Sequence, residues 1–189
     1  MDKFSVEKTP ILDLLIIEPK VFGDYRGFFV ETYNKKQFLD LGINVDFIVD
    51  GHSKSRKGVL RGLHFQAKHP QSKIVRSVQG KVYDVAVDLR RGSPTFGKYF
   101  GLILSEENKK MLYIPNGFVH GFLTLSSYAE ILYKFTDYHY PEHDSGIIWN
   151  DPDIGIDWPF ADYNIHRKIV SEKDQKLPKL SEIETPFTY

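Results

Sequence analysis

The sequence contains no cysteine among its 189 residues. This absence excludes a disulfide framework, a thiolate nucleophile and any zinc or iron–sulfur site built on cysteine ligands. A chain without thiols is compatible with the cytoplasm, which is the location we expect. The sequence also lacks a glycine-rich phosphate loop and a Gly-x-Ser-x-Gly elbow. Neither Walker-type phosphoryl transfer nor α/β-hydrolase chemistry is therefore supported.

The chain has no excess of charge and no long apolar run. Its 25 lysines and arginines balance 25 aspartates and glutamates, and the sequence pI is about 7.1. No net field attracts nucleic acid or an anionic membrane, although a local basic pocket for a small anion is still allowed. The longest early apolar run, Leu14–Ile17, is far shorter than a membrane span or a signal-peptide core. We therefore expect neither nucleic acid nor a membrane as a partner.

Short β-rich runs dominate what is present, and helical patterns are scarce. Turn residues separate these runs at a spacing that favours a sandwich or a barrel. The expected strands are Leu14–Ile17, Phe28–Tyr33, Val45–Val49, Val59–Gln66, Ile74–Gln79, Lys81–Leu89, Tyr99–Leu104, Met111–Ile114, Phe118–Leu125 and Ala129–Thr136. One short helix is expected at Lys35–Leu41, with Asn34 as its N-cap.

The length and composition fit a single domain. Hydrophobic residues make up 41% of the chain, enough for a sizeable core, and 189 residues lie within the usual domain range. We expect one all-β domain over residues 1–189 with a few short helices. The polar, proline-punctuated tail from about residue 160 is expected to wrap around the barrel.

One strand carries acids on a face of small residues. Alternation in the run Val82–Leu89 puts Asp84 and Asp88 on the same face as Val82 and Ala86. Two acids among small residues suit either a solvated face or the polar lining of a barrel mouth. The strand alone leaves both interpretations open.

The densest group of chemically versatile side chains is Gly58–Gln66, followed by Lys73. Arginine, histidine and lysine from neighbouring strands would form an anion pocket with a titratable base. Strict alternation turns Arg61 and His64 to opposite faces, so both face inward only if Gly62 forms a β-bulge. The alternative is that His64 is an ordinary core histidine, as most lone strand histidines are.

A second group, Pro115–His120, delivers a histidine into a strand after a proline–glycine turn. It resembles the second sequence motif of the cupin barrels, in which that histidine binds metal. The first cupin motif then needs a His-x-His pair and a glutamate, whereas the matching place here is His64–Gln66. Two distant histidines and a glutamine are a poor ligand set, so we predict no metal site.

Two further places could contribute chemistry. Tyr133 lies in the alternating run Glu130–Thr136 and could donate a proton, although most strand tyrosines only pack. The segment Ser171–Asp174 would ordinarily be a solvated turn.

Longer motifs run from about Ile16 to Asp174, nearly the whole chain. They are Gly23–Phe29, Gly58–Gln66, Val85–Arg90, Ser93–Gly97, Ile114–Phe122, Trp149–Pro152 and Ile154–Pro159. In this order they resemble the dTDP-4-dehydrorhamnose 3,5-epimerases, cupin-fold enzymes of deoxysugar biosynthesis. The resemblance implies a cupin-type jelly-roll β-barrel that epimerises carbons 3 and 5 of a dTDP-4-keto-6-deoxyhexose without a cofactor.

The chemistry implied by the resemblance needs a base, a cation and an acid. A ketone at carbon 4 acidifies the hydrogens on carbons 3 and 5, the cation stabilises the enolate, and the acid returns a proton to the opposite face. By resemblance, His64 is the base and Asp174 its orienting partner. Tyr133 is the acid, and Lys73 faces the developing oxyanion.

The resemblance also implies a substrate-binding set and a homodimer. The matching positions are Arg26, Glu31, Asp50, Arg61, His120, Tyr138, His139, Asp144 and Lys173. In the family, the residues that match Arg26 and Glu31 come from the neighbouring subunit. We therefore expect a homodimer whose N-terminal segment contributes to the adjacent site, and a nucleotide-diphosphate 4-keto sugar as substrate.

The departures from the family pattern lie at the nucleotide end. Val49 and Gly51 stand where two amides are usual, His139 where a tyrosine stacks on thymine, and Asp144 where a glutamate is usual. Alternatives are a single-carbon epimerase or an enzyme for CDP- or GDP-linked sugars. A non-catalytic sugar-binding cupin is a third, disfavoured because binding alone does not need both an acid and a base.

Overall fold

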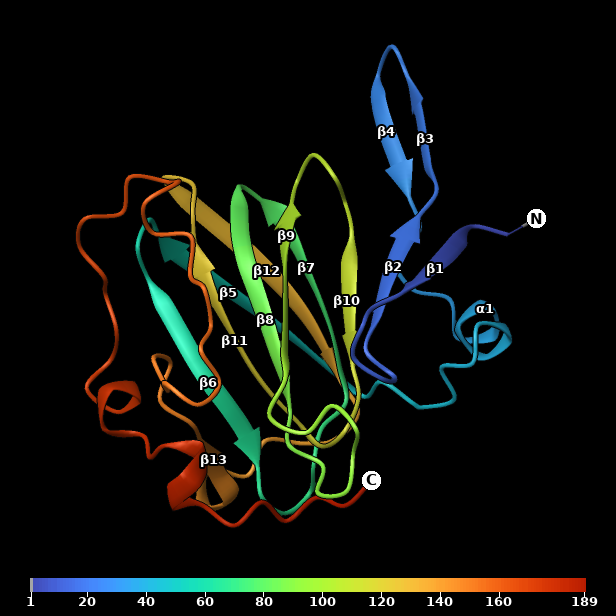
Figure 1. The fold of residues 1–189 in the computed structure, drawn as a ribbon. Coiled ribbons are helices and arrows are strands. Elements are labelled where there is room, and N and C mark those ends of the chain that lie inside the picture. Colours follow the sequence, from blue (N-terminus) through green and yellow to red (C-terminus); the bar gives the residue numbers. More distant parts are fainter. Residues whose placement is uncertain (1) are drawn as a thin grey trace.

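The computed structural model describes residues 2–189, and β-strands dominate it (Figure 1). The strands are β1 (Phe4–Lys8), β2 (Leu15–Pro19), β3 (Val21–Asp24), β4 (Gly27–Val30), β5 (Val49–Arg56), β6 (Leu60–Gln66), β7 (Lys73–Gln79), β8 (Lys81–Asp88), β9 (Tyr99–Ser105), β10 (Met111–Ile114), β11 (Phe118–Thr124), β12 (Tyr128–Phe135) and β13 (Asp144–Gly146). The helices are α1 (Lys35–Asp40) and the 3₁₀ turns η1 (Pro141–His143), η2 (Asp174–Lys176) and η3 (Leu180–Glu182).

Two antiparallel sheets face each other and form the barrel. One has the strand order β1-β2-β10-β7-β12-β5, and the other β13-β6-β11-β8-β9. Between them lies an apolar core that both sheets supply, for example Val75 and Ile131 from the first and Ala86 and Phe122 from the second. This arrangement confirms the prediction of an all-β barrel with few helices.

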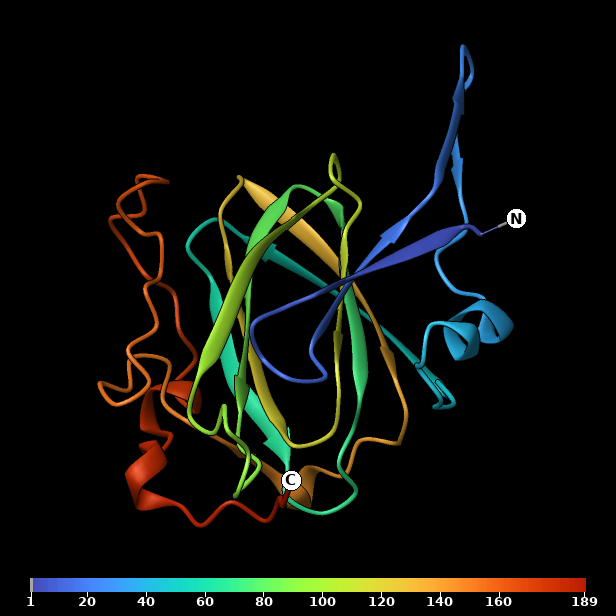
Figure 2. The same cartoon turned by 45° about the vertical axis from the view of Figure 1, so that its right-hand side comes forward.

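Each sheet also buries its outer face. Helix α1 inserts Phe38 beside Ile17 and Ile74 on the outside of the six-stranded sheet. The helix begins as expected, because the Asn34 side chain accepts a hydrogen bond from the Gln37 N–H. The C-terminal segment places Ile154 and Trp158 over the outside of the five-stranded sheet. In Figure 2 these two coverings lie on opposite sides of the barrel.

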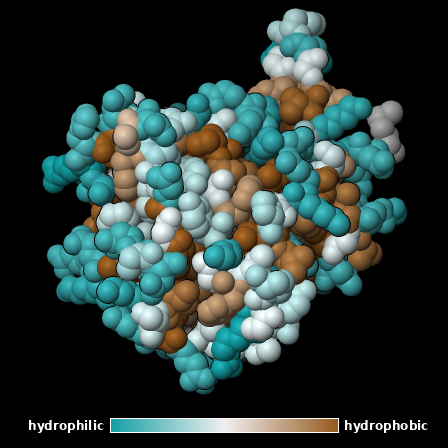
Figure 3. All heavy atoms as spheres, viewed as in Figure 1, coloured by the Kyte–Doolittle hydropathy of each residue, from teal (hydrophilic) through white to brown (hydrophobic). Residues whose placement is uncertain are grey.

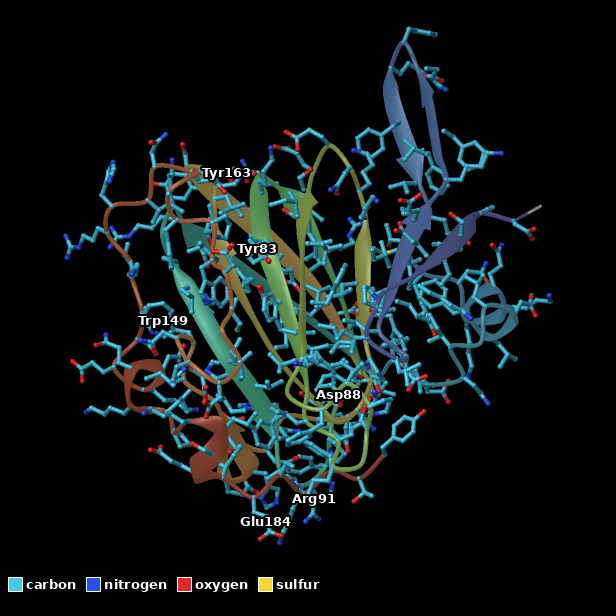
Figure 4. The ribbon with its side chains drawn as sticks, viewed as in Figure 1. Tyr83, Asp88, Arg91, Trp149, Tyr163 and Glu184 are labelled. Atoms are coloured by element: carbon cyan, nitrogen blue, oxygen red, sulfur yellow. The ribbon has the colours of Figure 1, made fainter. Side chains whose placement is uncertain are left out.

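The C-terminal segment runs the length of the five-stranded sheet. Figure 4 shows Trp149 and Tyr163 beside that sheet, and Arg91 with Glu184 at one end of the barrel. The Arg91 guanidinium and the Glu184 carboxylate pair at 3.1 Å, and the Thr185 hydroxyl donates to the Leu89 carbonyl at 2.7 Å. The covering therefore starts before residue 160 and reaches the chain end. The division into domains itself stays a prediction.

The two acids of strand β8, Asp84 and Asp88, are buried rather than exposed to solvent. Val82 and Ala86 pack in the core between the sheets, whereas Val85 and Val87 pack on the outer side. The expected alternation is therefore confirmed. Asp84 and Asp88 are both completely buried, so the solvated-face interpretation is wrong for this strand.

The expected strand at Val45–Val49 is wrong. Residues 44–48 have no regular structure, and the strand instead occupies β5, whose sequence is mostly polar. The apolar residues Val45 and Phe47 serve as packing for the outer cluster, where Phe47 meets the Tyr33 ring edge to face at 5.5 Å. The strands β1, β3 and β13 were not expected from the sequence.

A two-stranded hairpin, β3 with β4, projects away from the barrel (Figure 1). Phe28 and Phe29 on β4 are 61% and 63% exposed. Hydrophobic atoms lie uncovered where the hairpin leaves the body of the molecule (Figure 3).

Candidate active site

A cavity of about 770 Å³ opens between the two sheets. Its walls come from both sheets and from the C-terminal segment. Nine of the residues expected in the site line it: Arg61, His64, Lys73, His120, Tyr133, His139, Asp144, Lys173 and Asp174. The fold therefore brings together side chains that are up to 113 residues apart in the sequence.

A β-bulge allows two neighbouring side chains of β6 to reach this cavity. His64 pairs opposite His120 of β11, but the register shifts before Arg61 pairs with Phe122. A Cβ at Gly62, which lies in this shift, would come within 2.7 Å of the Gly121 Cα and of the His120 carbonyl oxygen. Only glycine fits there. The expected bulge is confirmed, and it turns both Arg61 and His64 toward the cavity.

His64 and Asp174 form a hydrogen-bonded pair. The His64 Nε2 lies 2.7 Å from Asp174 Oδ1, and Asp174 Oδ2 accepts the Gly62 N–H at 3.1 Å. Burial by itself would raise the pKa of Asp174, but its bonds to His64, Gly62 and Ser171 hold that pKa below the usual value. A carboxylate only accepts hydrogen bonds, so Nε2 carries the proton and Nδ1 is left free to accept one.

Tyr133 faces the same cavity from the opposite sheet. It lies on β12, whereas His64 lies on β6, and both line the cavity. Its hydroxyl is 3.1 Å from the Ser53 hydroxyl, and its ring stacks on Phe135 at 5.6 Å. Burial raises the pKa of Tyr133 far above its ordinary value, although the bond to Ser53 lowers it in part. The phenol therefore stays protonated and can act only as a donor of its proton at neutral pH.

Lys73 is a nearly buried cation in the wall of the cavity. It lies at the start of β7, is 9% exposed, and its ammonium sits 5.8 Å from the centre of the Phe135 ring. Burial lowers the pKa of Lys73 to about 8, while the negative charges of Asp84 and Asp144 work against that shift. Lys73 is therefore mostly protonated at neutral pH and titrates just above it.

His120 pairs with an acid that the sequence reasoning did not include in the site. Its Nε2 lies 3.0 Å from each carboxylate oxygen of Asp84. Both side chains are buried. The sequence does place Asp84 on the face of β8 that carries small residues. It does not predict that Asp84 is buried, because burial depends on the sheet that faces the strand.

A cluster at one rim of the cavity joins three expected substrate contacts. Asp144 accepts hydrogen bonds from His139 Nε2 and Lys173 Nζ, each at 3.0 Å. Burial would raise the pKa of Asp144, but these two partners hold it below the usual value.

Gln66, which the sequence indicates only as a poor metal ligand, forms hydrogen bonds with the backbone of the loop that carries His139. The Gln66 amide donates to the carbonyls of His69 and Tyr138, at 2.8 and 3.1 Å, and its oxygen accepts the Tyr140 N–H at 2.6 Å. These bonds fix the loop that carries His139. The Tyr138 side chain itself is exposed and does not line the cavity.

Three expected substrate contacts lie away from the cavity of their own chain. Arg26 is at the tip of the projecting hairpin and pairs with Asp24 at 2.6 Å. Glu31 follows the hairpin and accepts from Lys3 and Asn34. Asp50 is at the edge strand β5 and pairs with Lys134 at 2.7 Å. None of the three lines the cavity.

Residues 2–189 contain neither a candidate metal-binding cluster nor a helix suited to span a membrane. Across that range, no group of three or more histidine, aspartate or glutamate side chains is arranged to hold a metal ion. Within the same range, no helix has the length and apolar character needed to cross a membrane.

Comparison with known proteins identifies the family. The sequence profile described as dTDP-4-dehydrorhamnose 3,5-epimerase matches residues 8–182. The chain is 55% identical over 179 residues to the dTDP-4-dehydrorhamnose 3,5-epimerase of Salmonella typhimurium, covering 94% of this chain and 96% of that one.

Two solved structures extend the comparison. A dTDP-6-deoxy-D-glucose-3,5-epimerase from Legionella pneumophila, in complex with dTDP-4-keto-L-rhamnose, superposes with a TM-score of 0.94 at 46% identity and 98% coverage of both chains. A double mutant of a 3'-monoepimerase from Streptomyces bikiniensis, in complex with dTDP, has a TM-score of 0.85 at 27% identity, covering 93% of this chain and 87% of that one. The resemblance expected from the motifs is confirmed, and the chain belongs to the dTDP-4-dehydrorhamnose 3,5-epimerase family of isomerases.

Proposed function

We propose that this chain converts dTDP-4-dehydro-6-deoxyglucose to dTDP-4-dehydrorhamnose by inverting carbons 3 and 5 of the sugar. The observation that carries the proposal is the cavity in which a histidine–aspartate pair faces a tyrosine from the opposite sheet, with a buried lysine on β7, the strand beside that of the tyrosine. A base on one side and an acid on the other are what inversion of a carbon requires.

In this mechanism His64 removes the proton from the carbon next to the ketone. Asp174 holds the Nε2–H, so the free Nδ1 accepts the proton and the resulting imidazolium is stabilised by the carboxylate. The electron pair of the broken C–H bond moves into the enolate, whose oxygen carries the negative charge. Tyr133 then gives its proton to the same carbon from the other face, and the ketone reforms. His64 then releases its proton to solvent and Tyr133 takes one up, and with both groups reset the same steps follow at the second carbon.

The positive groups of the cavity stabilise the charge that develops. Lys73 is protonated at neutral pH and sits in a poorly solvated wall, where a fixed cation is worth more than in water. Arg61 lies beside His64 on the bulged strand, and its Nε donates to the Ser55 hydroxyl at 3.0 Å. Arginine suits the diphosphate, because its planar guanidinium binds such oxygens in pairs.

The hairpin supports a homodimer in which each chain completes the other's site. Its exposed apolar side chains, Phe28 and Phe29, are the kind of surface that soluble proteins cover with a partner. Arg26 and Glu31 sit on or next to the hairpin and outside their own chain's cavity. A second copy of the chain would bury Phe28 and Phe29, and its own cavity would receive Arg26 and Glu31. The cytoplasmic location of the dimer stays a prediction.

A single-carbon epimerase is the second candidate, because one of the solved relatives is a 3'-monoepimerase. Both reactions use the same base and acid, so the side chains of the cavity do not separate them. The identity of the product does. With dTDP-4-dehydro-6-deoxyglucose, we expect dTDP-4-dehydrorhamnose as the main product, resolved by chromatography and proton NMR. A product inverted at carbon 3 or at carbon 5 alone would favour the second candidate.

The choice of nucleotide needs a separate measurement, since Val49, Gly51 and His139 replace residues usual at the nucleotide end. Turnover of dTDP-, CDP- and GDP-linked 4-keto sugars tests it directly. We expect turnover of the dTDP sugar. A faster reaction with the CDP or GDP sugar would reject dTDP as the natural nucleotide while leaving the epimerisation chemistry intact.

A further inference from the structure

A second concavity, which we call the basic pocket, is lined by three cations. Its volume is about 410 Å³, and the cations are Arg56, Arg167 and Lys168. Beside them lie Trp149, which Figure 4 labels, and the amide side chain of Gln175. No acid among residues 2–189 lines this pocket. Because the chain as a whole carries no net charge, three cations around one concavity are a local feature of the surface.

The fold brings these cations together by joining the C-terminal segment to the turn after β5. The Ile169 N–H donates to the Gly58 carbonyl at 2.8 Å. Gly58 has a φ of +81°, and a Cβ there would lie 2.6 Å from the Arg167 carbonyl oxygen, so glycine permits this close approach. Arg167 and Lys168 are thereby held beside Arg56, the last residue of β5.

The charges of the basic pocket are not neutralised within the chain. Arg56, Arg167 and Lys168 are exposed, and none of them forms an ion pair with an acid among residues 2–189. The Lys168 ammonium lies 5.1 Å from the centre of the Trp149 ring and 4.6 Å from that of Phe160. Two aromatic rings therefore position this cation without cancelling its charge.

A phosphate group suits this arrangement better than a carboxylate does. A phosphate monoester carries about two negative charges at neutral pH and has three terminal oxygens that accept strong hydrogen bonds. Each arginine of the basic pocket can bind two such oxygens through its planar guanidinium, and Lys168 adds a point charge. A carboxylate has one charge and two oxygens, so it would leave part of the positive charge unused.

The basic pocket is separate from the active-site cavity in its charged groups. Ile169 and Val170 line both, but the two share no ionisable side chain. The Gln175 amide donates to the Val170 carbonyl at 2.9 Å and so fixes part of this shared wall. We propose that the basic pocket is a second anion site, which binds the phosphate group of a small phosphate-bearing molecule. This site does not depend on the proposed reaction.

The test is calorimetric titration of the wild-type protein and of the double variant Arg167→Gln, Lys168→Gln with glucose 1-phosphate and with inorganic phosphate. We expect binding at the basic pocket to be weakened about a hundredfold in the variant, since a hydrogen bond to a charged group contributes about tenfold or more in affinity. The active-site cavity contributes equally in both proteins and cancels in the comparison. Tighter binding of the ester would identify an organic phosphate as the ligand, and equal binding inorganic phosphate; both support the site.

Two controls make the test specific. Lys57→Gln removes a charge next to Arg56 from an exposed residue that does not line the basic pocket, so this variant should bind phosphate as the wild type does. Glucuronate, a sugar carboxylate, should bind the wild type at least about tenfold more weakly than glucose 1-phosphate.

Three results would overturn the proposal. They are equal phosphate binding by the wild type and the double variant, an equal loss in Lys57→Gln, and glucuronate binding as tight as that of the ester. None of these measurements uses epimerase activity, so failure of the proposed function would leave the test of the basic pocket intact.

Discussion

At the scale of single residues, the central feature is that the two histidines opposite one another on β6 and β11 each have their Nε2 atom bound by a carboxylate. Asp174 holds His64 and Asp84 holds His120. The two pairs differ in their surroundings, since His64 is partly exposed to the cavity and His120 is buried. The exposed member is the better base, because its free nitrogen can reach a substrate.

His64→Ala should abolish proton exchange at both carbons and leave the affinity for dTDP nearly unchanged. A positioned general base contributes about a hundredfold or more to the rate, and alanine retains nothing that could replace it. His166→Ala is the matched control, because that histidine is exposed and does not line the cavity. Retention of more than about a tenth of the wild-type rate in His64→Ala would mean that another group is the base.

Treatment with a strong chelator should leave the rate unchanged. The ketone already acidifies the neighbouring hydrogens, and the Nε2 atoms of His64 and His120 are engaged by carboxylates rather than free to bind a metal. The measurement is the epimerisation rate before and after exhaustive dialysis against chelator. Loss of activity that one divalent metal restores would contradict both the mechanism and the predicted absence of a metal site.

At the scale of elements, the two acids of β8 have separate uses. Asp84 lies in the middle of the strand and pairs with His120, whereas Asp88 ends the strand (Figure 4) and accepts hydrogen bonds from Arg90, Ser93 and Thr95. The Arg90 guanidinium also binds the Asp13 carboxylate at 2.7 Å. This network joins the end of β8 to the loops around it.

Asp88→Asn should lower the free energy of unfolding by about 3 kcal/mol, the usual cost of breaking a buried ion pair by removing one partner. Thermal or urea denaturation measures the change. Asp40→Asn makes the same chemical change in the exposed pair of Lys36 with Asp40 on α1, and its midpoint should stay at the wild-type value. Equal midpoints for the two variants would show that the Asp88 network contributes no stability.

Much of the barrel could be predicted from the sequence, because alternation on β8 and the glycine of the β6 bulge are local signals. Burial of Asp84 could not, since it depends on which sheet faces the strand. The strand β5 was missed because an edge strand with a polar sequence has no apolar alternation to read. The segment at Val45 and Phe47 was wrongly predicted as a strand because it is apolar. Its apolar residues pack against Tyr33 and α1 without forming a strand.

The candidate site shows the same division. The motifs indicated nine residues that line one cavity, from both sheets and the C-terminal segment. They gave no sign that Gln66 fixes the loop of His139, because that role depends on the folded positions of three backbone groups. Arg26 and Glu31 could not be placed near a site in one chain, since their expected site belongs to a second.

At the scale of the whole molecule, the projecting hairpin predicts complementation between two inactive variants. His64→Ala removes the proposed base, and Arg26→Ala removes the nucleotide contact that the proposed dimer would offer to the partner's site. A mixed dimer contains one site with both His64 and an intact partner's Arg26. Unfolding and refolding an equal mixture should therefore restore about a quarter of the wild-type sites, for random pairing in a twofold dimer.

The control for this experiment is the mixture of His64→Ala with Tyr133→Phe. These two side chains line the cavity of the same chain, so every site of the mixed dimer lacks one of them and no activity should be restored. No recovery of activity with His64→Ala and Arg26→Ala would show that Arg26 does not act in a partner's site. A monomer in sedimentation at working concentrations would lead to the same conclusion.

The most direct test of the proposed chemistry is solvent exchange followed by proton NMR. The enzyme is incubated in deuterated water with dTDP-4-dehydro-6-deoxyglucose, and the signals of the sugar protons are followed with time. The proposed mechanism predicts loss of the signals from carbons 3 and 5, with those from carbons 1 and 2 unchanged, and no loss at all with His64→Ala. Retention of both the carbon 3 and the carbon 5 proton by the wild-type enzyme would contradict it.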